Sequence, residues 1–180
     1  MNIHVHRILL AGILAVVIFQ AAATARAEEK VTLSDMHICC PSCVKAIQTA
    51  AATVPGVKCV ASQDDYTTTL TADNLATLQK GVDALVKAGF CGTPDNKAIK
   101  IADVKAPQGK VTKLEIAHVH NCCGKCTAAL KDALSDVKGI TSNTLEPKKT
   151  SFVLEGNFDA GEAVKALVKS GFYPELKEAK

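Results

Sequence analysis

The chain has 180 residues, of which 48% are hydrophobic and only 4% aromatic, and its formal net charge at pH 7 is +3. This composition is typical of a globular protein whose core consists of aliphatic side chains rather than aromatic rings. The small net charge, without a concentrated basic stretch, argues against a nucleic-acid-binding protein. Eight cysteines are the unusual feature of the composition.

The first 27 residues have the pattern of a signal peptide. Arg7 lies in a short basic region, residues 8–19 form an uncharged apolar stretch, and residues 25–27 are Ala-Arg-Ala. This order is typical of a segment that is cleaved after export, and we expect cleavage before Glu28. An uncleaved anchor is the alternative, but the apolar stretch is short for a membrane span. We therefore expect a periplasmic or secreted protein, with no stable membrane insertion after cleavage.

The rest of the chain contains two copies of one unit. Residues 37–43 (HICCPSC) and 120–126 (HNCCGKC) share the pattern His-x-Cys-Cys-x-x-Cys at an offset of 83 residues. Residues 84–90 (ALVKAGF) match residues 166–172 (ALVKSGF) at an offset of 82. A repeat of this length indicates a duplicated domain rather than a solenoid repeat.

The duplication predicts the domain boundaries. The segment that contains Pro107 and Gly109 separates the copies and has the composition of a linker. We expect a first domain over 28–102, a linker over 103–109 and a second domain over 110–180.

Both copies show the same order of expected elements. Alternating apolar residues predict strands, apolar residues at helical spacing predict helices, and Gly residues end the helices. Asp73 or Asn74, and Asp159, are the expected N-caps of the second helix in each copy. The expected strands are 31–36, 57–62, 66–72 and 98–101, then 114–119, 140–145, 151–154 and 175–178. The expected helices are 42–54 and 75–88, then 125–137 and 160–170. The β-α-β-β-α-β order predicts an α+β fold with two tandem ferredoxin-like sandwiches.

A unit of this order, with Cys-x-x-Cys between its first strand and first helix, resembles the heavy-metal-associated (HMA) domain. That family includes copper chaperones, the N-terminal modules of metal-pumping ATPases and periplasmic mercury-binding proteins. The residues that match its motif are Cys40 and Cys43, and Cys123 and Cys126. The resemblance implies a bound metal ion, and a partner that is another metal-binding protein or a membrane transport protein.

The motif departs from the family pattern Gly-Met-Thr-Cys-x-x-Cys at the same three positions in both copies. A His replaces the Gly, the Met is lost, and a third Cys replaces the Thr. Two thiolates alone suit Cu(I) or Hg(II), whereas three thiolates and an imidazole match a tetrahedral Zn(II) site. We expect one ion per domain, Cu(I), Zn(II) or Hg(II). The candidate ligands are Cys40, Cys43, Cys123, Cys126, Cys39, Cys122, His37 and His120. In the alternative interpretation, the two histidines are ordinary residues at the sheet ends.

Two cysteines lie outside the motifs. Cys91 follows the second helix of the first copy, and we expect it near Cys40 and Cys43, as a ligand, a disulfide partner or a gate. Its counterpart in the second copy is Tyr173. We expect Cys59 to be a small buried hydrophobic residue.

Metal carriage, buffering or sensing competes with two other functions. Cys-Pro-Ser-Cys and Cys-Gly-Lys-Cys are also similar to the motifs of thiol-disulfide oxidoreductases. An envelope interaction module with disulfide-locked loops is the third alternative, because exported cysteines usually oxidise. The sequence contains no recognisable set of catalytic residues, so we expect no enzyme.

Overall fold

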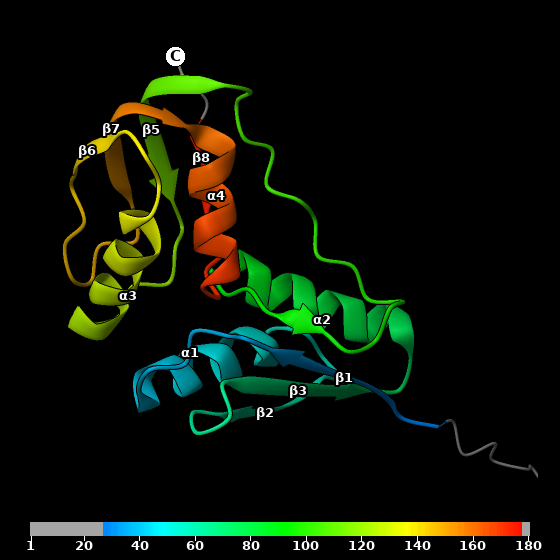
Figure 1. Cartoon of the computed structure of the whole chain (residues 1–180). Coiled ribbons are helices and arrows are strands. Elements are labelled where there is room, and N and C mark those ends of the chain that lie inside the picture. The colour runs from blue at the N-terminus through cyan, green and yellow to red at the C-terminus, as the bar shows by residue number, and fades with distance from the viewer. Residues whose placement is uncertain (1–26, 178–180) are drawn as a thin grey trace, which may run out of the picture.

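The computed structural model describes residues 27–177. The predicted signal peptide, residues 1–27, therefore lies outside the described residues except for Ala27. Within residues 27–177, no helix has the length and apolar character needed to span a membrane. The described part of the chain has an α+β fold, with two four-stranded antiparallel sheets and four helices (Figure 1).

The first unit contains the sheet with strand order β2-β3-β1-β4. Its elements are β1 (Glu29–Ser34), α1 (Pro41–Ala52), β2 (Lys58–Ser62), β3 (Thr67–Ala72), α2 (Leu75–Lys87) and β4 (Thr93–Pro94). Val31 of β1 pairs with Leu70 of β3, and both side chains are buried. Helix α1 faces this core with Cys43, Ile47 and Ala51, which are spaced one helical turn apart.

The second unit repeats this arrangement with strand order β6-β7-β5-β8. Its elements are β5 (Lys110–Ala117), α3 (Gly124–Ser135), β6 (Ile140–Asn143), β7 (Phe152–Asp159), α4 (Ala160–Lys169) and β8 (Glu175–Leu176). Leu114 of β5 pairs with Leu154 of β7 in its core. The strand order of both sheets is consistent with ferredoxin-like folds.

The predicted caps of the second helices are confirmed. The side chain of Asn74 accepts a hydrogen bond from the N–H of Thr77 at the start of α2. The side chain of Asp159 accepts a hydrogen bond from the N–H of Glu162 at the start of α4.

The predicted strand over 98–101 is wrong, because the last strand of the first unit is β4, at Thr93–Pro94. The Gln79 side chain of α2 accepts a hydrogen bond from the N–H of Lys100 and donates one to its carbonyl oxygen. The N–H of Ala98 donates to the Asn96 side chain. These side chains take the main-chain hydrogen bonds that a neighbouring strand would otherwise supply.

The two units contact each other through the segments that follow α2 and α4. Phe90 and Phe172 form an antiparallel bridge. The N–H of Cys91 donates to the carbonyl of Gly171, and the N–H of Tyr173 donates to that of Gly89, both at 3.0 Å. Equivalent positions of the two copies thus exchange hydrogen bonds, which gives the contact an approximate twofold symmetry.

Candidate metal centre

Each Cys-rich loop starts where the first strand of its unit ends. Asp35 and His118 follow β1 and β5, and their positive φ angles of 57° and 52° turn the chain out of the sheet. The next residues, Met36 and Val119, donate their N–H groups to main-chain carbonyls of a loop in the same unit. Both loops are therefore fixed to their sheets at equivalent points.

Each loop ends in a helix whose N-cap is a cysteine. Cys40 and Cys123 precede α1 and α3 with extended φ angles of −163° and −157°. Burial raises the pKa of Cys40, but hydrogen bonds from the backbone N–H of Cys43 and from the side chain of Cys122 together leave the pKa below its usual value. The backbone N–H of Cys126 lowers the pKa of Cys123 in the same way. A helix start thus favours the thiolate form that binds metals.

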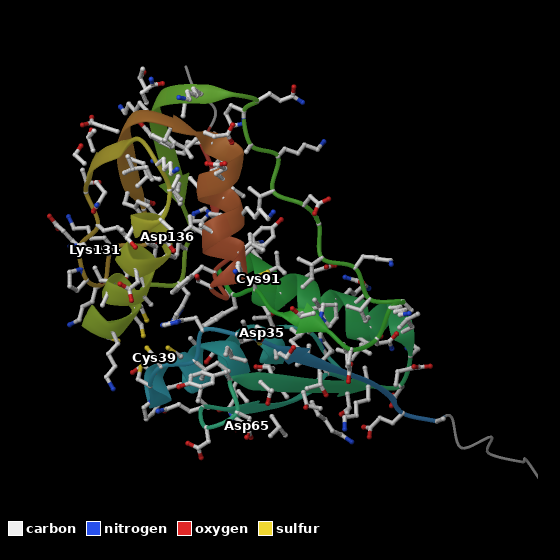
Figure 2. The ribbon with its side chains drawn as sticks, in the orientation of Figure 1. Asp35, Cys39, Asp65, Cys91, Lys131 and Asp136 are labelled. Atoms are coloured by element: carbon white, nitrogen blue, oxygen red, sulfur yellow. The ribbon has the colours of Figure 1, made fainter. Side chains whose placement is uncertain are left out.

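The two loops meet, and their six sulfur atoms form one cluster. Within the first loop, the sulfurs of Cys40 and Cys43 are 3.7 Å apart. Across the boundary, the sulfur of Cys43 lies 3.7 Å from that of Cys122, and Cys39 lies 3.5 Å from Cys126. Figure 2 shows Cys39 and neighbouring sulfur atoms between α1 and α3. All eight cysteines are free thiols.

The burial of the cluster is uneven. Cys43 and Cys126, in the first turns of the helices, are fully buried. Cys39, Cys40, Cys122 and Cys123 are partly exposed. The cluster therefore has a closed side within the protein and a side open to solvent.

The histidines of the two motifs stack across the boundary. His37 packs on Phe172 with ring centroids 4.4 Å apart, and His120 packs on Phe90 at 4.1 Å. Among the described residues, the Nε2 atoms of both histidines are buried without a hydrogen-bond partner. Burial lowers the pKa of His37, although the charge on Cys43 opposes this shift. The lowered pKa favours the neutral imidazole. A buried nitrogen without a partner is costly, and a metal ion would satisfy it.

The thiols of the cluster differ in acidity. A hydrogen bond from Cys43 lowers the pKa of the buried Cys126 thiol to about 6, although burial opposes the shift. Burial raises the pKa of Cys39, and so do its hydrogen bond and charge interaction with Cys126. Burial and the charge of Cys126 also raise the pKa of Cys122. The thiolate of Cys126 is thus favoured at neutral pH, whereas Cys39 and Cys122 stay protonated until a cation compensates their charge.

All eight predicted ligands lie in groups with the spacing of a metal site. Cys43, His120, Cys122 and Cys126 have ligand atoms within 4.8 Å of one another. The other groups at this spacing are His37 with Cys39 and Cys126, Cys39 with Cys40 and Cys43, and Cys40 with Cys122 and Cys123. Three of these four groups combine residues of both units. Thiolate and imidazole donors at this spacing fit Zn(II), Cu(I) or Hg(II).

The position of Cys91 differs from the expectation, because it belongs to none of these groups. Phe90 points toward His120, and successive side chains of an extended segment alternate. Cys91 therefore faces the other way, into a cavity of about 610 Å³ that Tyr173 also lines. Figure 2 shows Cys91 beside α2 and α4, away from Cys39. Cys59 packs against the core but is only partly buried, and this burial raises its pKa to about 11.

Sequence reasoning missed one residue that positions the second loop. The buried side chain of Asn121 donates to the carbonyls of Glu146 and Lys149 at 2.8 and 2.9 Å, and accepts from the Thr127 hydroxyl at 2.8 Å. The first loop has Ile38 at this position, fully buried. The replacement of a buried apolar residue by Asn in the second copy was the available signal.

Comparisons with known proteins give little further information. No family model matches the chain, and no curated protein matches it. The N-terminal soluble domains of Bacillus subtilis CopA are similar at 16% identity and a TM-score of 0.31, over 84% of this chain and 95% of that one. The first two RRM domains of yeast poly(U)-binding protein Pub1 are similar at 11% identity and a TM-score of 0.26, over 84% and 100%. Such low TM-scores assign no ligand to this chain. The function is therefore inferred from the residues of the site.

Proposed function

We propose that this chain is an exported metal-binding protein that holds soft or borderline ions in a thiolate cluster built by both units. The observation that carries the proposal is the convergence of six free thiols from two distant segments, with sulfurs as close as 3.5 Å. Exported thiols at such distances tend to oxidise, and a bound metal protects them. The protein carries, buffers or senses the metal, and the ion is Cu(I), Zn(II) or Hg(II).

The cluster favours a shared centre over the one ion per domain expected from the sequence. The distance of Cys43 to Cys122, across the boundary, equals its distance of 3.7 Å to Cys40 in its own loop. An ion bound to Cys43 therefore has ligands of both units equally within reach. We propose that neither unit holds the metal alone.

The proposed export rests on the sequence of residues 1–27. Expression in a bacterial host followed by mass measurement of the envelope fraction tests it. A chain that begins at Glu28 supports export, whereas a full-length chain in the cytosol contradicts it.

Metal binding is tested by purifying the protein anaerobically, titrating its free thiols and measuring bound metal by elemental analysis. We expect bound metal that is lost in the double variant Cys43→Ser/Cys126→Ser. Cys59→Ser is the matched control, since Cys59 lies on β2, outside the cluster. If no metal binds under reducing conditions and the thiols instead cycle with a disulfide substrate such as insulin, the protein is a thiol-disulfide oxidoreductase.

A further inference from the structure

We propose that the closed side of the cluster is a binuclear site for tetrahedral divalent ions of the zinc class, with Cys43 and Cys126 as bridging thiolates. This inference rests on the proposed metal-binding function and adds the number of ions and the ligands of each. The ligands of the two ions are Cys43, Cys126, Cys122 and His120 for one, and Cys43, Cys126, Cys39 and His37 for the other.

The sulfur distances of the first ligand set match a tetrahedral ion. Zinc–sulfur bonds of about 2.3 Å place two sulfurs of a tetrahedral site about 3.8 Å apart. Cys122 lies 3.7 Å from Cys126 and 3.7 Å from Cys43. Cys43 and Cys126, which form the third side of this triangle, are 3.9 Å apart. The three sulfurs thus form one face of a tetrahedron of the right size.

The second ligand set forms a matching face on the other side of the same edge. Cys39 lies 3.7 Å from Cys43 and 3.5 Å from Cys126. Since the Cys43–Cys126 edge belongs to both triangles, two ions that occupy them share both buried thiolates. The approximate twofold symmetry of the chain exchanges the two triangles, because Cys39 and Cys43 are the counterparts of Cys122 and Cys126.

A histidine lies beside each of the two sulfur triangles. The ligand atom of His120 lies within 4.8 Å of those of Cys43, Cys122 and Cys126. The ligand atom of His37 lies within 4.8 Å of those of Cys39 and Cys126. Each histidine has a buried Nε2 atom without a hydrogen-bond partner. A Cys₃His set is a common zinc site, and coordination accounts for both nitrogens.

The remaining thiols, Cys40 and Cys123, face each other across the boundary at 4.0 Å. They define the competing arrangement, in which all six sulfurs bind a cluster of trigonal Cu(I) ions and the histidines bind none. Such a cluster leaves the buried Nε2 atoms without partners. The histidines therefore favour the binuclear site.

The test uses the reduced chain, without residues 1–27, under anaerobic conditions. Zn(II) is counted by native mass spectrometry, and Co(II) is the spectroscopic probe. We expect two ions per chain, the absorption of tetrahedral Co(II) with thiolate ligands, and a Co(II) paramagnetic signal that weakens when the second ion binds. This weakening reports bridging thiolates and requires no variant.

Variants then identify the ligands. His37→Phe and His120→Phe keep a ring against the partner phenylalanine but remove the nitrogen. We expect each to weaken the binding of one Zn(II) ion about tenfold or more, whereas His118→Asn, which changes an exposed histidine but suits its left-handed backbone, leaves binding unchanged. Cys43→Ser should abolish the magnetic coupling, whereas Cys59→Ser, on β2 and outside the cluster, should leave two coupled ions.

Three results would overturn the binuclear site. These are a single Zn(II) ion per chain, two uncoupled Co(II) ions, and about four Cu(I) ions whose binding is insensitive to the histidine variants. Each leaves the proposed metal-binding function intact. A reduced, folded protein that binds none of these metals refutes that function itself.

Discussion

The main chains of Phe90 and Phe172 pair as an antiparallel bridge across the boundary between the two units. Each ring also stacks on the histidine of the opposite Cys-rich loop, Phe90 on His120 and Phe172 on His37. The contact that holds the units together therefore also positions the imidazoles beside the thiols. Changes at this contact should affect metal binding even where they touch no ligand.

Gly171→Ala tests this connection. Gly171 has a φ of +82°, and a Cβ atom there would collide with the N atom of His37 and the carbonyl oxygen of Asp35. We expect a loss of unfolding free energy and weaker metal binding, because the units must move apart. Urea unfolding and Zn(II) titration measure the two effects.

Gly109→Ala is the matched control, since Gly109 has a φ of +80° and a Cβ atom added there would meet no atom within 4 Å. It should cost only the roughly 1–2 kcal/mol of a left-handed backbone and leave the metal affinity unchanged. Equal effects of the two substitutions would contradict a role of Gly171 in docking the units.

The stability of the metal-free, reduced protein should depend on pH through Cys126. Its pKa is about 6 in the folded protein, against a value of 9.0 without the fold. The folded state thus favours the thiolate, and the stabilisation is fully present above pH 9 and lost as the pH falls toward 6. We expect unfolding free energy to rise with pH across this range. The ultraviolet absorbance of thiolates should show a first ionisation at a pH near the pKa of about 6 of Cys126.

In Cys126→Ser, both the low ionisation step and the corresponding rise of stability should disappear. Cys59→Ser should retain both, because burial alone raises the pKa of Cys59 to about 11. An unchanged first ionisation in Cys126→Ser would assign the acidic thiol to another residue.

Asn121→Ala should loosen the second Cys-rich loop. It removes the donor to the carbonyl groups of Glu146 and Lys149 and the acceptor of the buried Thr127 hydroxyl. Unsatisfied buried groups cost about 1–3 kcal/mol each, so we expect a loss of roughly 2 kcal/mol or more. Thermal or urea unfolding measures it. Asn157→Ala, at an exposed Asn, should stay within about 0.5 kcal/mol, and a similarly small effect at Asn121 would argue against the anchoring role.

Cys91→Ser should leave the metal content unchanged, because Cys91 faces the cavity beside Tyr173 rather than the cluster. Elemental analysis of the purified variant checks this. Loss of an ion would show that Cys91 reaches the metal after all, as the sequence alone had suggested.

The duplication predicted most of the elements of both units, because each copy supports the assignment of the other. The strand predicted over 98–101 failed for a local reason. The side chain of Gln79, on α2, binds the main chain of Lys100, and no residue pattern within 98–101 reveals this.

The candidate ligands also followed from the sequence, but their arrangement did not. An offset of 83 residues shows that Cys43 and Cys126 are equivalent and does not show that they touch. Gly89 and Gly171 were predicted to end helices, and they do so with positive φ angles. Their second role, to let the main chains of the two units approach, depends on contacts between the copies.

The contact of Cys43 and Cys126 also has a consequence for the unfolded chain. An ion bound to both sulfurs joins residues 83 positions apart and acts as a reversible cross-link. By chain entropy, a permanent link closing a loop of this size is worth about 4–5 kcal/mol. With metal bound, the two units should therefore unfold in a single transition. Without metal, one unit can unfold before the other.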